Sequence, residues 1–536
     1  MFTTLMNKMG WPYWATPRYK KLVALTKMVD GTFYDHLPHD FYTEEDHAGN
    51  YIPLVERRPS AQSMMAFEVV SGLSRKLFAG RHVPRVTHDN PAFLQWVMKI
   101  IATSALYEKF QQAMLWGSVG SVAMTFTLID GELRSNVWRP YQCVPTFDRM
   151  GDLSALRVQY VTKGSVLVRS GFTHDCKGDV LDPTLNYWFI KEWTADEEHT
   201  FYPLPEAEYS PTGEDEYMLV VVPEKVFTHG LGMVPAIWIR NLPGGEGVDG
   251  ISTFGIAANN IIEIDYTMSQ LGRGIRYSAA PQLVIIGDMD ESDGMNYRRG
   301  PVGVLKLKSS YGDETQKFGG SDAKLLEMVG NGTQVGLNYV DTLRKATLNA
   351  ISASARTAQT HTGALSGRSM ELMDDSFYDL VNAMRSTYGD GGFVPFLSKI
   401  VAAYARTGSL PPEIAGMQEE ELTSFGIRWP KVFTSTPQDE MSMVESLTMA
   451  TQNGLLDIEV AKEYLFAQMD LEDYRVESPP QTGSDAVPTA PKEGTVPDDN
   501  SEQYNEGINP DERRPGPQGH TLPRRDVNQG ARKITI

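Results

Sequence analysis

The 536-residue sequence predicts an α+β protein, and three features of its apolar pattern lead to that class. Helical spacing dominates residues 59–117, the alternation typical of strands dominates residues 118–242, and two long helical runs then bracket a short apolar segment. The 41% hydrophobic and 10% aromatic content is enough to bury real cores. We therefore expect a globular chain of several domains over most of its length.

Charge and cysteine content exclude several classes of protein. The chain has 49 basic and 68 acidic residues, a net charge of -19, which argues against a broad surface that grips nucleic acid. Its two cysteines, Cys143 and Cys176, form no C-x-x-C pair, so a reducing cytosol is the simplest origin. No run approaches the ~20 apolar residues of a membrane span, and no signal peptide is evident, so we expect no membrane partner.

Two helices are expected first. Residues 59–78 have an amphipathic pattern with Ser60 as a plausible N-cap, and one face carries Met64, Phe67, Val70, Leu73 and Leu77. A second helical pattern runs from Asn90 to Gly117, with Pro91 near its first turn.

Strands are expected next. Asp130-Gly131 lies between two alternating runs and predicts a hairpin, and "ALRVQYVTK" is a further strand. Three more stretches, "YWFIKEWTADEEHTFYPL", "YMLVVVPEKVFTHG" and "VPAIWIRNL", extend the β-rich tract to about Leu242.

A long helix follows the strands. Apolar residues recur every three or four positions over about 25 residues, about 38 Å of helix, at Phe254, Ala258, Ile261, Ile264, Met268, Leu271 and Ile275. Two strand-like stretches, "PQLVIIGD" and "RRGPVGVLKLKSS", come next, and a second long helical run extends from Asp322 to Ala353. The "GNG" at Gly330 to Gly332 weakens that run and marks either a kink or a later start.

The remainder alternates loops and helices. Ser352 to Gly367 is small and polar and predicts an exposed loop, and helical stretches follow from Ser369 towards Arg406 and from Gln438 to about Tyr474, the latter broken at "QNGLLD". Glu477 to Ile536 has nine prolines, ten acidic and seven basic residues and few apolar ones, which is typical of a disordered tail.

Catalytic and binding motifs are weak. The spacing Gly245-x-Gly247-x-x-Gly250 matches a dinucleotide fingerprint, but Pro243 follows the strand and Asp265 lies only fifteen residues on, in mid-helix. No G-x-x-x-x-G-K-[ST] or G-x-S-x-G motif occurs, and His36 and His39 lack further clustered ligands. We therefore expect no catalytic residue, no metal and no cofactor.

The order of elements resembles the portal protein of tailed bacteriophages, the head-to-tail connector. The resemblance covers about residues 20–475 and rests on the joint order of soft motifs: "LVALTKMVDGTFYD", "KLFAGRHVPRV", "MLWGSVGSVAMTF", "ALRVQYV", "GISTFGIAANNIIEIDYTMSQLGRGIRY", "SGRSMELM" and "NGLLDIEVAKEYL". It implies a helical and β-stranded wing (1–249), a stem helix (250–279), a small α/β clip (280–320), a second stem helix (321–351), a tunnel loop (352–366), a long helix returning to the wing (367–429), a helical crown (430–476) and the disordered tail (477–536).

The resemblance also implies function and partners. Portal proteins form a ring, most often of twelve subunits, at one capsid vertex, through which double-stranded DNA is packaged and ejected without sequence-specific binding. The expected partners are the large terminase subunit, the major capsid and scaffolding proteins and the head-tail adaptor or tail proteins. The expected location is the virion, after assembly in the host cytoplasm. A closed ring made by one repeated heterologous contact is physically sensible, and a mostly acidic wall lets a duplex slide.

Site residues follow from the same resemblance. The tunnel loop assigns DNA-facing positions to Arg356, Thr357, Thr360, His361 and Thr362. The clip assigns the motor or adaptor surface to Arg298, Arg299, Lys306 and Lys308. Stem packing, including packing against neighbouring subunits, is assigned to Ile261, Ile264, Met268, Leu271 and Ile275.

Two other classes remain open. A nucleotide-binding α+β enzyme would use the loop from Gly245 to Gly250, and bound nucleotide in the purified protein would favour it. An acidic interaction scaffold would act as a monomer through its disordered tail. The portal interpretation alone predicts a very large ring that persists without the tail.

Overall fold

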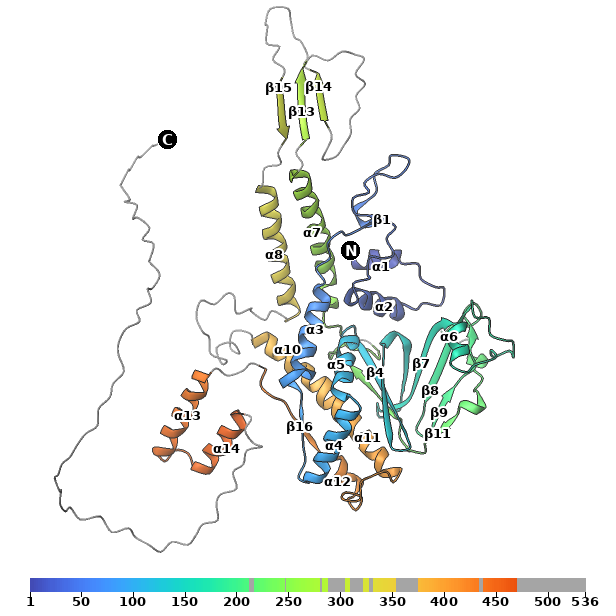
Figure 1. The fold of residues 1–536 in the computed structure, drawn as a ribbon, viewed down its shortest axis with the longest axis vertical. Coiled ribbons are helices and arrows are strands. Elements are labelled where there is room, and N and C mark those ends of the chain that lie inside the picture. Colours follow the sequence, from blue (N-terminus) through green and yellow to red (C-terminus); the bar gives the residue numbers. More distant parts are fainter. Residues whose placement is uncertain are drawn as a thin grey trace, which may run out of the picture. The chain divides into compact units, whose positions relative to one another are not determined.

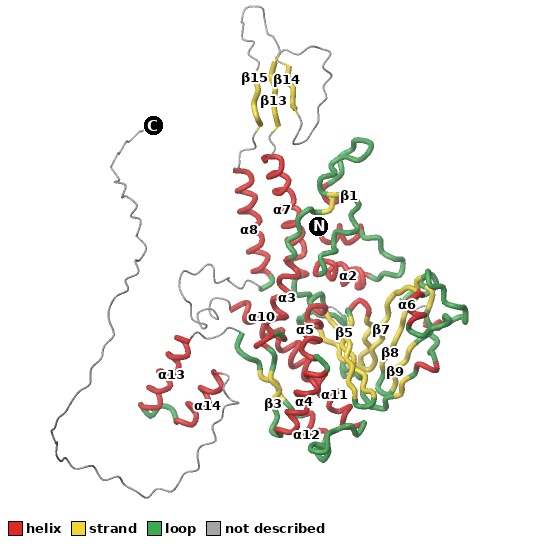
Figure 2. The backbone as a smooth tube through the Cα atoms, viewed as in Figure 1, coloured by secondary structure: helices red, strands yellow, loops and turns green. Residues whose placement is uncertain are grey.

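The computed structural model describes residues 1–211, 216–245, 247–279, 282–287, 304–308, 322–326, 331–352, 375–432 and 437–469 (Figure 1). Backbone contacts divide the chain into Met1–Asp473 and Tyr474–Ile536, and the second unit lies outside the described residues. Helices and strands both contribute extensively, which confirms the α+β class (Figure 2).

Five helices form most of the N-terminal part: α1 (Phe2–Lys8), α2 (Pro17–Val29), α3 (Met65–Phe78), α4 (Pro91–Thr103) and α5 (Leu106–Gly117). Thr16 caps α2 by accepting from Tyr19 N, 3.1 Å away, and Asn90 caps α4, as its sequence position suggests. Short 3-10 turns also occur: Leu54–Glu56, Gly80–His82, Pro140–Gln142, Glu216–Met218, Pro223–Lys225 and Gly255–Ala257.

Two helix boundaries differ from expectation. Ser60 caps no helix, because α3 begins only after Met64, which has φ 51°. The single helix expected between Asn90 and Gly117 is divided by Ala105, with φ 50°, into α4 and α5. Neither break has a glycine or proline to announce it, so tertiary packing sets both.

A three-stranded antiparallel sheet lies against these helices, in the order β12 (Ala236–Arg240), β4 (Ser121–Ile129), β5 (Glu132–Trp138). The predicted hairpin at Asp130-Gly131 is confirmed, and both residues have positive φ, 50° and 80°, as a type I′ turn requires. Side chains from α5, this sheet and the later helix α11 share the largest hydrophobic core, where Phe126 meets Phe396 edge to face.

A second, antiparallel sheet has the order β11 (Phe227–Thr228), β9 (Glu197–Thr200), β8 (Asn186–Trp193), β7 (Leu153–Lys163), β6 (Cys143–Phe147). A short strand, β10 (Leu204–Pro205), pairs with β8, and helix α6 (Gly164–Arg169) follows β7. The two sheets share a small core that contains Ala123, Val158 and Trp193. The β-rich tract expected up to Leu242 is therefore confirmed except in "YMLVVVPEKVFTHG", where the prediction was wrong: the stretch has two 3-10 turns and only the two-residue strand β11. Pro223 has no N–H to donate to a strand ladder.

Three tight turns use one chemical solution. In each, an Asp Oδ1 accepts from the backbone N–H groups two and four residues on, and a glycine three residues on takes positive φ. The turns begin at Asp46, Asp148 and Asp175. Each is an Asx-type turn that closes its loop with local hydrogen bonds.

The long helix and strand expected after the β-rich tract are α7 (Ala258–Ala279) and β13 (Gln282–Gly287). β13 pairs in parallel with β14 (Val304–Lys308) and antiparallel with β15 (Asp322–Leu326). The helix expected from Asp322 is thus wrong at its start: residues 322–326 form a strand, and α8 (Asn331–Ala350) begins at the "GNG". The "GNG" therefore marks a later helix start and not a kink.

The final described elements are α10 (Asp375–Arg385), a π-helical segment (Ser386–Phe393), α11 (Val394–Arg406), α12 (Glu419–Thr423), β16 (Gly426–Arg428), α13 (Pro437–Gln452) and α14 (Ile458–Met469). β16 pairs with β3 (Arg85–Thr87), and β1 (His39–Asp40) pairs with β2 (Arg57–Arg58). The helices expected after Ser369 and after Gln438 are confirmed where the structure describes them. None of the described helices has the length and apolar content that crossing a membrane requires.

Candidate functional site

The pair of long helices, α7 and α8, is the most distinctive feature of the described chain. The two helices pack against each other and are joined through the three strands β13, β14 and β15 (Figure 1). Their contact is close at Gly336, because a Cβ there would overlap the Leu271 side chain. A glycine on α8 therefore lets the two helix backbones approach at this level.

The first half of α7 is buried in its own chain. Ile261 and Ile264 belong to a core that also contains residues of α1 and α2. Met268 packs at the edge of the same core, Leu271 meets α8, and Ile275 is 49% exposed. Of the five residues assigned to stem packing, Ile261 and Ile264 therefore pack within the chain, and only Ile275 is largely open to a neighbour.

A buried carboxylate fixes α7 to the N-terminal segment. Asp265 accepts from Tyr34 Oη at 2.8 Å and from Ser63 N at 2.6 Å. Burial raises the pKa of Asp265, against the effect of these two donors, and burial also raises the pKa of Tyr34. The carboxylate therefore holds two elements distant in sequence at one point on the helix.

Neighbouring polar groups extend this anchor. Ser269, one turn after Asp265, accepts from Ala61 N at 3.0 Å, and Tyr266 donates to Arg57 O at 3.0 Å. Sequence reasoning missed this role of Asp265. Its place inside an apolar helical stripe was the available signal, since a carboxylate is rarely buried without partners.

Much of the surface of α8 that does not face its own chain is exposed to solvent. Among the helix residues whose burial the structure describes, those that face their own chain form one stripe: Thr333, Gly336, Val340, Leu343, Thr347 and Leu348. Elsewhere on α8 three large side chains are exposed: Val335 (67%), Leu337 (48%) and Tyr339 (49%). Val335 and Tyr339 are one turn apart and share one side of α8, whereas Leu337 lies on a different side. Two neighbouring exposed apolar side chains of this kind suit a contact with another chain.

The glycine-rich loop before α7 is packed against its own chain. Gly250 donates to Gly120 O at 2.9 Å, and a Cβ on Gly250 would lie 2.6 Å from Leu242 O and 2.7 Å from Asn241 N. α7 begins at Ala258, eight residues later. A dinucleotide site needs a glycine turn that opens directly into a helix N-terminus, and this loop does not open directly into α7.

An arginine locks the same loop in place. Arg18 makes two hydrogen bonds to Asp249, at 2.6 and 2.9 Å, and also donates to Cys143 O and Pro140 O. Ser121 adds a 2.5 Å bond to the same carboxylate. The glycine-rich loop is thus part of the contact between α2 and the first sheet.

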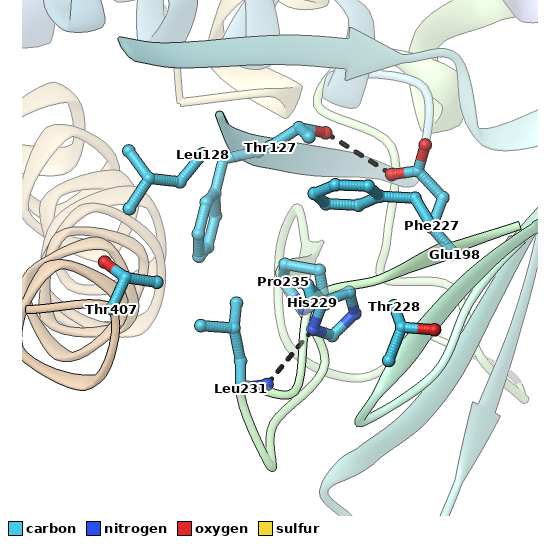
Figure 3. Close-up of a pocket in the computed structure, with 10 residues that line it drawn as sticks. Thr127, Leu128, Glu198, Phe227, Thr228, His229, Leu231, Pro235 and Thr407 are labelled. Carbon is cyan, nitrogen blue, oxygen red and sulfur yellow. Dashed lines mark hydrogen bonds between the residues drawn. The ribbon is translucent and has the colours of Figure 1, made fainter. Parts of the chain in front are cut away.

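A pocket of about 120 Å³ lies between the two sheets (Figure 3). Glu198, one of several polar residues that line it, is 8% exposed, accepts from Trp193 Nε1 at 2.7 Å and pairs with Lys191. Beside it, His229 Nδ1 accepts from Leu231 N, and burial lowers the pKa of His229. Because groups of the same chain already satisfy Glu198, the pocket has the chemistry of a sheet-to-sheet junction.

The remaining predicted site residues are placed only in part. Lys306 and Lys308 lie on β14, paired with Ile285 and Gly287 of β13. Arg298 and Arg299 lie outside the described residues, as do Arg356, Thr357, Thr360, His361 and Thr362. α8 ends at Ala350 and Ser352 has φ 53°, next to the expected start of the loop. His36 donates from Nδ1 to Phe33 O, and no three metal-ligating side chains cluster in the described part of the chain.

Comparisons with known proteins give likenesses of fold at low identity. No protein-family model and no curated protein matches the sequence. Similar solved chains include one in "Neck of empty GTA particle computed with C6 symmetry", with 12% identity, 86% of this chain and 97% of that chain covered and a TM-score of 0.38. A chain in "Virion of native gene transfer agent (GTA) particle" has 13% identity, covers 87% of this chain and 98% of its own length, and has a TM-score of 0.35.

Proposed function

We propose that this chain is the subunit of a ring-shaped portal, the head-to-tail connector of a tailed phage or phage-like particle. The ring is a conduit for double-stranded DNA during packaging and ejection, and it docks the packaging motor, capsid proteins and tail adaptors. The subunit itself carries no catalysis. Twelve copies is the number that the family resemblance favours.

The observation that carries this proposal is the helix pair, with Val335 and Tyr339 exposed together on one side of α8. α7 is fixed at its base by Asp265, and α8 returns beside it after the three strands. Val335, Leu337 and Tyr339 are then left in water in a single copy. A heterologous contact with the next copy would bury them, and a rotation that closes turns such a contact into a ring.

The helix pair also supports the assignment of the stem. A conduit wall needs a rigid element in each subunit, and two packed helices joined beyond their ends by a small sheet provide one. In this scheme the β13–β15 sheet is the clip, with Arg298, Arg299, Lys306 and Lys308 proposed to face the motor or adaptor. Arg356, Thr357, Thr360, His361 and Thr362 are proposed to face the DNA.

The nucleotide-enzyme alternative finds less support. Its glycine loop is filled by the backbone of its own chain at Gly250, and Asp249 is occupied by Arg18. The scaffold alternative predicts a monomer whose apolar α8 face has no partner. The two remaining functions therefore differ in the mass of the particle in solution.

Mass photometry of the full chain tests the proposal, with a double variant, Val335→Ser and Tyr339→Ser, and a control, Asn338→Ser, on the same helix. Each apolar side chain buried at a contact contributes about 1.5–3 kcal/mol, so we expect the double variant to shift the population from ring to single copies. The control should keep the ring. A ring that is equally stable in the double variant would overturn the assignment of this face.

A further inference from the structure

The helix pair exposes apolar side chains on two opposite sides. Val335 and Tyr339 are one turn apart on α8 and are 67% and 49% exposed. Leu337 lies between them in sequence and is 48% exposed, but at about 3.6 residues per turn it points ~160° away from each of them. We call the side of the pair with Val335 and Tyr339 the projecting side, and the side with Leu337 the receiving side.

Contacts with α3 identify the receiving side. Arg344, two turns after Leu337 and on the same side of α8, donates from Nη2 to Glu68 of α3 at 2.8 Å. On α7, Met268 packs at the edge of the core that contains residues of α3. Ile275 lies two turns further along that side of α7 and is 49% exposed. Leu337 and Ile275 are therefore apolar residues on the side where α3 lies, in the part of the helix pair that α3 leaves uncovered.

The two sides match in height along α8. Because Leu337 is midway between Val335 and Tyr339, it is offset by only about 3 Å from each along the helix axis. A closed ring relates its copies by rotation alone, so each residue keeps its height from one copy to the next. In a ring whose axis runs along α8, Leu337 of one copy therefore faces the gap between Val335 and Tyr339 of its neighbour. A side chain that enters such a gap is the knobs-into-holes arrangement of packed helices.

Charge is complementary lower on the same two sides. The helices run antiparallel and touch at Leu271 and Gly336, so Glu263 and Arg344, each eight residues from that contact, lie at one height (Figure 1). Glu263 is exposed and points about 160° away from Asp265, which binds the segment before α3, so it belongs to the projecting side. A guanidinium has five donors, so Arg344 can bind Glu263 of the next copy and keep its bond to α3.

We infer that Leu337 and Ile275 form the surface that receives Val335 and Tyr339 of the next copy of this chain. This contact rests on the proposed function, because it requires a ring, and it adds the surface that covers the exposed side chains of α8. A partner of another kind would cover one side and leave the other in water. A second copy buries both sides with one repeated contact, which is the property of a heterologous ring.

Cysteine pairs in the full chain test this contact. In a Cys176→Ser background, the one remaining cysteine is Cys143, which is buried. The test variant adds Leu337→Cys and Tyr339→Cys, which point to opposite sides of one helix and are too far apart for a disulfide within one copy. The control adds Gln334→Cys and Tyr339→Cys, because Gln334 is exposed between the two sides and points away from α7.

Under mild oxidation, the test variant should give a ladder of linked chains on a denaturing gel, from two chains up to the complete ring. Tyr339→Cys alone and the control should stay single chains, and mass photometry of the same samples reports whether rings are present. Rings without a ladder, or an equal ladder in the control, would overturn the inference and keep the proposed function. Dimers from Tyr339→Cys alone would also overturn the inference, since the projecting side would then meet itself. Single copies of the unmodified chain would instead refute the proposed function.

A second variant covers the case in which the cysteines prevent assembly. Leu337→Ser with Ile275→Ser leaves Val335 and Tyr339 intact, so only the receiving side is changed. We expect its rings to dissociate at a protein concentration at least about tenfold higher than rings of the unmodified chain, and Asn338→Ser to have no such effect. Rings of unchanged stability in the double Ser variant would overturn the inference.

Discussion

Replacing Asp265 tests whether a buried carboxylate fixes the long helix α7. Asp265→Ala leaves the Tyr34 hydroxyl and the Ser63 N–H, both now bonded at 2.8 and 2.6 Å, without an acceptor. Each unsatisfied buried donor costs about 1–3 kcal/mol, so the variant should lose about 2–6 kcal/mol. In Asp265→Asn, the amide oxygen can still accept from Ser63 N, and the amide NH2 can donate to the Tyr34 hydroxyl oxygen. We therefore expect a smaller loss, about 1 kcal/mol.

The assay is thermal melting at fixed protein concentration. With an unfolding entropy of about 2.1 cal/mol/K per residue, the first unit of 473 residues has about 1 kcal/mol/K, so 1 kcal/mol shifts Tm by about 1 °C. Asp265→Ala should therefore melt about 2–6 °C lower. Equal Tm values for the Ala variant and the unmodified chain would refute the anchoring role, as would an Asn variant that loses as much as Ala.

The difference in Tm between the unmodified chain and Asp265→Asn should depend on pH, which a packing effect alone would not produce. Burial raises the folded-state pKa of Asp265 above its ordinary value of 3.8, so the folded state favours the protonated form. The stability that protonation of Asp265 adds to the folded state is fully present below pH 3.8 and is lost as the pH rises through the folded-state pKa. The Tm advantage of the unmodified chain over Asp265→Asn should thus shrink as the pH rises above 3.8, and an advantage that grows with pH would contradict the raised pKa.

Three further substitutions test the packing of the chain. Gly250→Ala places a Cβ 2.6 Å from Leu242 O and should lower the free energy of unfolding by about 1–3 kcal/mol. Gly272→Ala, on α7, adds a Cβ in open space and should raise the free energy of unfolding by about 1 kcal/mol. Melting temperatures that do not separate in this order would contradict the packing described. Tyr388→Phe removes the 2.9 Å bond from the buried Tyr388 hydroxyl to Asn241 and should cost about 1–3 kcal/mol, measured by melting, and a neutral result would mean that Asn241 finds another donor.

Local patterns predicted the elements whose cause is local. The Asp130-Gly131 turn chemistry sets the β4–β5 hairpin, and the apolar stripe beginning at Phe254 gives α7. The strand β15 was missed because "DAKLL" has good helix formers, and its extended state depends on pairing with β13, about forty residues earlier. Long-range pairing of this kind leaves no periodic signal within a five-residue window.

The candidate site was predicted in outline rather than in detail. Ile261 and Ile264 fit the apolar stripe, but the same stripe cannot distinguish a contact within the chain from one between copies, and the structure buries both in the chain. The Asp265 anchor was missed because it joins residues more than 200 positions apart. The channel-facing residues, from Arg356 to Thr362, stay a prediction.

The central claim is a closed ring of subunits that meet along the stem helices. Native mass measurement of the purified full chain, followed by imaging of the same sample, tests it most directly. We expect one closed particle near twelve times the 59.7 kDa mass of a single chain, with a central opening. A stable single copy at all salt concentrations, with Val335, Leu337 and Tyr339 still exposed to solvent, would contradict it.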